Sequence, residues 1–139
     1  MRVVLDANVY VIALIRPEGP PGLILRLFLR GDAFDLVLSP AIVEETLRAF
    51  TYPKVRKYLR AKVDPALWFE DIVLLAHLVD VKASPSRISV DPDDDKYLAA
   101  AVSGGASLVV SGDPDLPLVG EFERVRIITP KAFLDRLLG

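Results

Sequence analysis

The sequence predicts an α/β sandwich whose central sheet is mainly parallel. Two observations carry this prediction. Short apolar runs of strand length alternate along the chain with longer segments of helical spacing, which is typical of strands connected by crossover helices. The first of these runs, Arg2–Asp6, is apolar and β-branched and ends in an acid, as expected for a buried parallel strand.

Strand and helix candidates follow one another along the whole chain. The predicted strands are Arg2–Asp6, Asp35–Ser39, Val79–Lys82, Ser107–Ser111 and Arg124–Thr129. Proline and capping residues mark most helix starts, and glycines mark several ends. The predicted helices are Val9–Ile15, Gly22–Arg30, one from Pro40 behind the cap Ser39, a basic one from Pro53 through VRKYLRAK, an apolar one from Pro65 through Leu78, one from Asp91-Pro92 to Gly104-Gly105, and Pro130–Leu138.

Composition narrows the class of protein. The 139 residues have the length of one domain, which we expect to span residues 1–139. No apolar segment approaches the roughly 20 residues that cross a bilayer, and no export signal opens the chain, so we expect a cytoplasmic protein without a membrane segment. The absence of cysteine excludes disulfides and thiolate metal sites. Asn8 is the single asparagine and glutamine is absent, as is typical of proteins that work at high temperature.

Acidic residues in four separate segments are predicted to meet at one edge of the sheet. Asp6 ends the first strand, and Asp113 follows the fourth. Because ligands bind beyond the carboxyl ends of parallel strands, both should face the same crevice. Glu44 and Glu45 lie in the helix after the second strand, and Asp93–Asp95 begin the helix before the fourth. Adjacent helical residues point about 100° apart, so only one of the two glutamates should face the crevice.

Such a cluster needs either protons or a cation, because like charges a few ångströms apart repel strongly. Oxygen ligands without histidine or cysteine favour Mg²⁺ or Mn²⁺ over zinc. One or two such ions can activate water and stabilise a phosphodiester during hydrolysis. The structural alternative is that acids near helix starts serve only as caps, and it stays open for Asp91 and Asp93–Asp95.

Four segments of the chain resemble the PIN-domain ribonucleases, in particular the prokaryotic proteins identified as toxins of toxin–antitoxin pairs. They are VVLDANV at Val3–Val9, LSPAIVEETLRAFTYPKV at Leu38–Val55, DPDDDKYLAAAVSGGASLVVSGDPDL at Asp91–Leu116, and the closing ITPKAFL. The resemblance implies a three-layer α/β/α sandwich with a central parallel sheet of about five strands. It also implies Mg²⁺ or Mn²⁺ as cofactor, single-stranded or structured RNA as substrate, a homodimer or higher oligomer, and a possible small antitoxin protein as partner.

The resemblance also implies roles for individual residues. The acids that match the family's metal-binding and catalytic positions are Asp6, Glu45, Asp94 and Asp113. Glu44 and Asp95 remain the alternatives in register to Glu45 and Asp94. The residues expected to support the site are Asn8, Ser111, Asp91 and Asp95, with Ser111 where the family often has a hydroxyl residue that orients the site.

Basic residues and the lone histidine have weaker interpretations. The densest basic stretch runs from Lys54 to Lys62 and could hold RNA phosphates, although a solvated helix face is an equal alternative. The RNA-binding candidates are Arg16, Lys54, Arg56 and Lys57. His77 falls in the predicted apolar helix, where a packed or surface histidine is a better interpretation than a catalytic base.

Two other functions fit part of the sequence. A haloacid-dehalogenase-like phosphatase would use the strand-end aspartate as a nucleophile, but that family has a second aspartate two residues later, where this chain has Asn8. A non-catalytic PIN-like module that binds or regulates a partner is the other alternative, and the intact set of acids argues against it. No P-loop, dinucleotide fingerprint or serine-hydrolase elbow is present.

Overall fold

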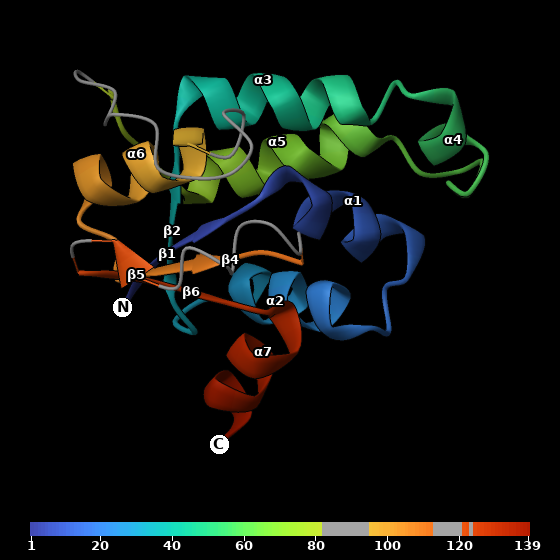
Figure 1. Ribbon diagram of the computed structural model, residues 1–139. Coiled ribbons are helices and arrows are strands. Elements are labelled where there is room, and N and C mark those ends of the chain that lie inside the picture. Colours follow the sequence, from blue (N-terminus) through green and yellow to red (C-terminus); the bar gives the residue numbers. More distant parts are fainter. Residues whose placement is uncertain (82–94, 113–120, 123) are drawn as a thin grey trace.

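The computed structural model describes residues 1–81, 95–112, 121–122 and 124–139, and its sheet has helices on both faces (Figure 1). The strands are β1 (Arg2–Leu5), β2 (Asp35–Leu38), β3 (His77–Leu78), β4 (Leu108–Val110), β5 (Glu121–Phe122) and β6 (Val125–Ile128). They lie in the order β3-β2-β1-β4-β6-β5. The first five are parallel, whereas β5 is antiparallel to β6. The predicted parallel sheet of about five strands is therefore confirmed, with a short sixth strand added at one edge.

The helices form the two outer layers of the sandwich. Figure 1 shows α3 (Pro40–Ala49), α5 (Pro65–Leu75) and α6 (Asp95–Gly104) on one face, and α2 (Pro20–Leu29) with α7 (Pro130–Leu138) on the other. The first helix, α1 (Ala7–Ile15), contacts both α2 and α3, and the short α4 (Pro53–Arg56) follows α3. Among the described residues, no helix combines the length and the apolar character needed to span a membrane.

Three helices begin at the prolines that the sequence predicts, and in the structure each of these prolines directly follows a capping side chain. The side-chain oxygens of Ser39, Asp64 and Thr129 accept hydrogen bonds from backbone N–H groups in the first turns of α3, α5 and α7, at 3.3, 3.2 and 3.1 Å. The proline that follows each cap has no N–H to leave unsatisfied, and its fixed φ suits the first helical turn. These starts are encoded locally, and each helix then packs through its apolar side.

The basic helix predicted from Pro53 is much shorter than expected, because α4 ends at Arg56 and turns follow. Like charges explain the early end. Lys54 and Lys57 are three residues apart and Arg56 and Arg60 four apart, so a helix through this stretch would bring cations together on one face. The prediction of a helix through the whole basic stretch was wrong.

The third strand also differs from the prediction, which placed it at Val79–Lys82 and put His77 in the preceding helix. Instead α5 ends at Leu75, and Ala76 turns into an extended conformation. His77 and Leu78 then pair with Val37 and Leu38 at the edge of β2. The backbone hydrogen bonds offered by that edge outweigh the local preference of an apolar segment for helix.

Candidate active site

The strands β1 and β4 are neighbours in the sheet, although the chain forms β2 and β3 between them. From β1 the sheet grows on one side through β2 and β3, and from β4 it grows on the other side through β6. Open parallel sheets bind ligands beyond the carboxyl ends of the strands where this direction reverses. The register pairs Leu5 with Val110, so Asp6 and Ser111, the next residues of the two strands, meet at that edge.

The carboxylate of Asp6 is buried, with only 3% of the residue exposed, and its two oxygens have different partners. Oδ1 accepts hydrogen bonds from the backbone N–H groups of Asn8 and Val9, at 2.8 and 3.2 Å. Oδ2 accepts a hydrogen bond from the hydroxyl of Ser111, which is fully buried. These donors hold the carboxylate in one orientation at the end of β1.

Part of this arrangement is helix capping. The sequence predicted that the first helix begins at Val9, but α1 begins at Ala7, and Asp6 is its N-cap. Capping accounts for the partners of Oδ1. It does not account for the burial of the side chain or for the second oxygen, which faces Ser111 at the end of a different strand.

Glu45 lies on the side of α3 that faces α6. Its Oε2 accepts hydrogen bonds from Nζ of Lys96 at 2.5 Å and from the hydroxyl of Tyr97 at 2.9 Å. Glu44 points into solvent and pairs with Arg48 one turn later, at 2.7 Å. Of the two adjacent glutamates, Glu45 is therefore the one directed toward the carboxyl edge of the sheet.

Tyr97 connects the segments that carry the two acids. Its hydroxyl donates to Glu45 and accepts a hydrogen bond from the backbone N–H of Ala7, at 3.1 Å, next to Asp6. Burial raises the pKa of Tyr97 well above its ordinary value; the Ala7 bond lowers it, and the charges of Asp6 and Glu45 raise it further. The hydroxyl therefore keeps its proton at neutral pH and remains a donor to Glu45.

A second buried tyrosine lies near Asp6 but makes different contacts. The ring of Tyr10 packs edge-on against Phe69, with centroids 5.1 Å apart, and within the described parts of the chain its hydroxyl has no hydrogen-bond partner. Burial raises the pKa of Tyr10, and the charge of Asp6 raises it further. Tyr10 thus contributes to core packing, whereas Tyr97 also bonds Glu45 and the backbone next to Asp6.

The acids fit the hard divalent ion that the sequence implied, as far as they are described. Asp6 offers a carboxylate at the end of β1 and Glu45 offers one beside Tyr97, and carboxylate oxygens suit Mg²⁺ or Mn²⁺. Within the described residues (1–81, 95–112, 121–122 and 124–139), no group of three or more acids or histidines forms a metal site. Asp94 and Asp113, the other two predicted ligands, lie outside the described residues, as does Asp91. Asp95 is partly exposed and begins α6.

The remaining candidates lie on the surface. Asn8 is exposed on the first turn of α1, and Arg16 is exposed at its end. The other RNA-binding candidates, Lys54, Arg56 and Lys57, are exposed around α4. His77 is an exposed strand residue 3.9 Å from Asp35, at the amino end of β2, so it lies away from the acids.

Sequence reasoning missed Lys96 and Tyr97 as parts of this site. Both directly follow Asp95 in the chain, and that position beside a predicted acidic helix start was the available signal. Tyr97 occurs in the apolar segment YLAAAV, where a tyrosine is usually a core residue. Only the contact between α6 and α3 shows that its hydroxyl reaches Glu45.

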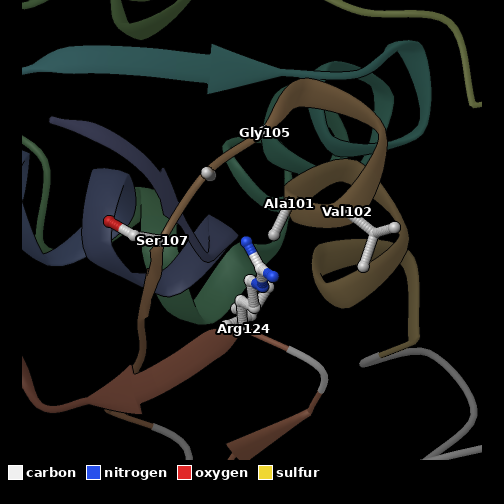
Figure 2. Close-up of a pocket in the computed structure, with 7 residues that line it drawn as sticks. Ala101, Val102, Gly105, Ser107 and Arg124 are labelled. Carbon is white, nitrogen blue, oxygen red and sulfur yellow. The ribbon is translucent and has the colours of Figure 1, made fainter.

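A cavity of about 730 Å³ lies at the opposite edge of the same strands (Figure 2). It is lined by the end of α6, by Ser107 before β4, and by Arg124 and Val125 at the start of β6. In Figure 2 the side chain of Arg124 extends toward Ala101 on α6. The described residues that line this cavity include no acid, in contrast to the buried Asp6 at the carboxyl edge.

Comparisons with known proteins agree with this geometry. A sequence profile described as the PIN domain matches residues 2–115, which includes Asp6, Glu45 and Ser111. An uncharacterised protein of Methanocaldococcus jannaschii is 30% identical to this chain over 146 residues, covering 97% of this chain and 90% of the relative. The profile covers well over half of the chain and includes both β1 and β4. The chain therefore belongs to the PIN-domain family, a family of nucleases.

Proposed function

We propose that this protein is a Mg²⁺- or Mn²⁺-dependent endoribonuclease that hydrolyses phosphodiester bonds of single-stranded or structured RNA. The observation that carries the proposal is the buried carboxylate of Asp6 at the point where the sheet reverses direction, bound by Ser111 from the neighbouring strand. Glu45 lies on the far side of Tyr97 from the start of α1. Membership of a nuclease family supports hydrolysis as the reaction.

The chain's own residues would prepare this site before an ion binds. Asp6 and Glu45 would hold the ion together with Asp94 and Asp113, and the bound ion would supply an activated water and a countercharge for the phosphate. Ser111 and the first turn of α1 fix the orientation of Asp6. Tyr97 fixes Glu45 relative to Ala7, so that both carboxylates keep their places without reorganisation during the reaction.

We propose that RNA phosphates contact the exposed cations beyond the acids. Asp6 and Arg16 cap the two ends of α1 and are ten residues apart, so Arg16 lies about 15 Å from Asp6 along the helix. Lys54, Arg56 and Lys57 extend the positive charge around α4. Exposed cations of this kind bind the RNA backbone without reading its sequence, and their contribution should weaken as salt rises.

The direct test is cleavage of single-stranded RNA by purified protein with Mn²⁺ and with a chelator. Wild-type protein should cleave only with the metal, and Asp6→Asn should lose at least about a hundredfold in rate, since it keeps the cap but loses the charge. Glu45→Gln should fall by a similar factor, whereas Glu44→Gln, one residue away on the exposed side, should cleave like wild type. Equal cleavage by wild type and Asp6→Asn would refute the proposal.

We further propose that the whole chain acts as one domain and that it pairs with a second copy. Beyond residue 115, where the profile ends, β6 completes the sheet beside β4, and α7 packs against α2. Leu67, Leu74 and Leu75 on α5 and Leu78 on β3 are each more than half exposed, which supports a protein partner there. Light scattering should give the mass of a dimer, and a monomer would leave a small antitoxin as the partner to seek.

A further inference from the structure

The contact between Lys96 and Glu45 is the closest ion pair in the described structure, and the proposed mechanism does not use it. Nζ lies 2.5 Å from Oε2, and both side chains are largely shielded, with 24% and 30% exposed. Two further pairs among the described residues, Arg48–Glu44 and Lys131–Asp135, lie on helix surfaces with more than half of each side chain exposed. Lys96 is thus placed to act on a carboxylate of the site.

Resting on the proposed function, we propose that Lys96 is the resident counterion of Glu45 and competes with the divalent ion for that carboxylate. A divalent ion bound to Glu45 would bring its two positive charges close to the ammonium group. The positive charges of the ion and of the Lys96 ammonium group repel each other. Because the site is only partly exposed, solvent and salt screen this repulsion incompletely. Metal binding therefore requires Lys96 to leave Glu45, and its return accompanies metal release.

In the metal-free protein, the ion pair between Lys96 and Glu45 stabilises the arrangement of the two acids. Asp6 and Glu45 both lie close enough to Tyr97 for their charges to raise its pKa, so the two carboxylates share one poorly solvated region. Lys96 neutralises one of them, and Tyr97 holds the same oxygen in place. Glu45 thus keeps its position without an ion, at the expense of a weaker affinity for the ion.

The test is a Mn²⁺ titration of the full chain, followed by electron paramagnetic resonance of free Mn²⁺. Lys96→Met removes the competing charge and should tighten Mn²⁺ binding about tenfold. Lys96→Arg keeps the charge and should bind like wild type. Arg48→Met is the matched control, because it removes the same charge from the pair formed by Glu44, and it should also leave the affinity unchanged. In Glu45→Gln, adding Lys96→Met should no longer tighten binding.

A second measurement needs no variant at position 96. The side-chain amine signal of Lys96 in wild-type protein, followed by nuclear magnetic resonance during Mg²⁺ titration, should shift as its bond to Glu45 breaks, while the signal of Lys131 should not. A fixed Lys96 signal at saturating Mg²⁺, or unchanged or weaker Mn²⁺ binding by Lys96→Met, would overturn the inference while leaving the nuclease proposal standing. If no variant and no wild-type protein bound Mn²⁺, the proposed function would fail first, and this inference with it.

Discussion

The two edges of the β1–β4 pair carry opposite chemistry. At the carboxyl edge, Asp6 and Ser111 are buried and bonded to each other. At the amino edge, Arg2 and Ser107 are exposed, and a cavity of about 730 Å³ opens beside Arg124. The described lining of the cavity has no acid, whereas the carboxyl edge buries the carboxylate of Asp6. Burying a carboxylate is costly unless hydrogen bonds compensate for it, and this cost favours the edge with Asp6, over the cavity, as the place of the proposed activity.

The largest expected effect is the difference in cleavage rate between variants of the two serines that flank β4, one at each edge. Ser111→Ala removes the hydroxyl bound to Asp6 and should lower metal-dependent cleavage roughly ten- to a hundredfold, as is usual for groups that orient a metal ligand. Ser107→Ala at the other end of β4 should cleave like wild type, as should Arg124→Ala in the cavity. Rates normalised to folded protein would check this, and a loss of rate in the cavity variant would contradict the assignment of the edges.

Substitutions near the amino edge should instead change the free energy of unfolding. A Cβ added to Gly104 would lie 2.6 Å from Cγ1 of Val37, where α6 packs against β2. Gly104→Ala should therefore lower the free energy of unfolding by about 1–3 kcal/mol, even though alanine is the better helix former. Ser103→Ala, exposed on the same turn, should be neutral. Urea unfolding would measure both, and the remaining folded Gly104→Ala protein should still cleave RNA.

The smallest expected effect is on how the free energy of unfolding depends on pH, and it distinguishes the two buried tyrosines near the carboxyl edge. An unfolded tyrosine ionises near pH 10, whereas burial holds the pKa of Tyr10 and Tyr97 well above this value in the folded state. Above about pH 10 the folded state thus binds more protons than the unfolded state, and the free energy of unfolding should fall by about 1.4 kcal/mol per pH unit for each tyrosine.

Tyr10→Phe should remove one tyrosine's share of this alkaline slope, and because the lost hydroxyl has no described partner, stability at neutral pH should hardly change. Tyr97→Phe should remove the same share but also weaken the protein at neutral pH, by about 1–2 kcal/mol, since the N–H of Ala7 loses its acceptor. Tyr52→Phe, on the surface, is the control. Identical alkaline slopes in wild type and Tyr10→Phe would show that Tyr10 ionises in the folded state.

The main features of the fold follow from local patterns. The apolar strands and the proline-marked helix starts are visible in the sequence, and parallel pairing then brings the residues after β1 and β4 to one edge. The meeting of Asp6 and Ser111 was therefore accessible to reasoning from strands alone. Glu45 required the family resemblance, because a helix position does not specify which neighbour the helix will face.

Contacts between residues far apart in the chain explain the features that could not be predicted from the sequence. In the sequence, Lys96 and Tyr97 resemble ordinary residues at the start of a helix. Only the packing of α6 beside α3 brings them to Glu45. The shift of the third strand to His77 likewise depends on an open edge of β2 that no local pattern reveals. Such residues gain their roles from partners far away in the chain, which propensity and periodicity do not report.

The register of β1 with β4 also decides when the site can exist. Asp6 and Ser111 are 105 residues apart in the chain, and Glu45 and Tyr97 are 52 apart. During synthesis, Asp6 leaves the ribosome first, and its partner Ser111 is added 105 residues later. A nascent enzyme of the proposed kind would consequently remain inert toward the ribosomal, transfer and messenger RNA that surround it until the segment that carries Ser111 has been synthesised and has folded.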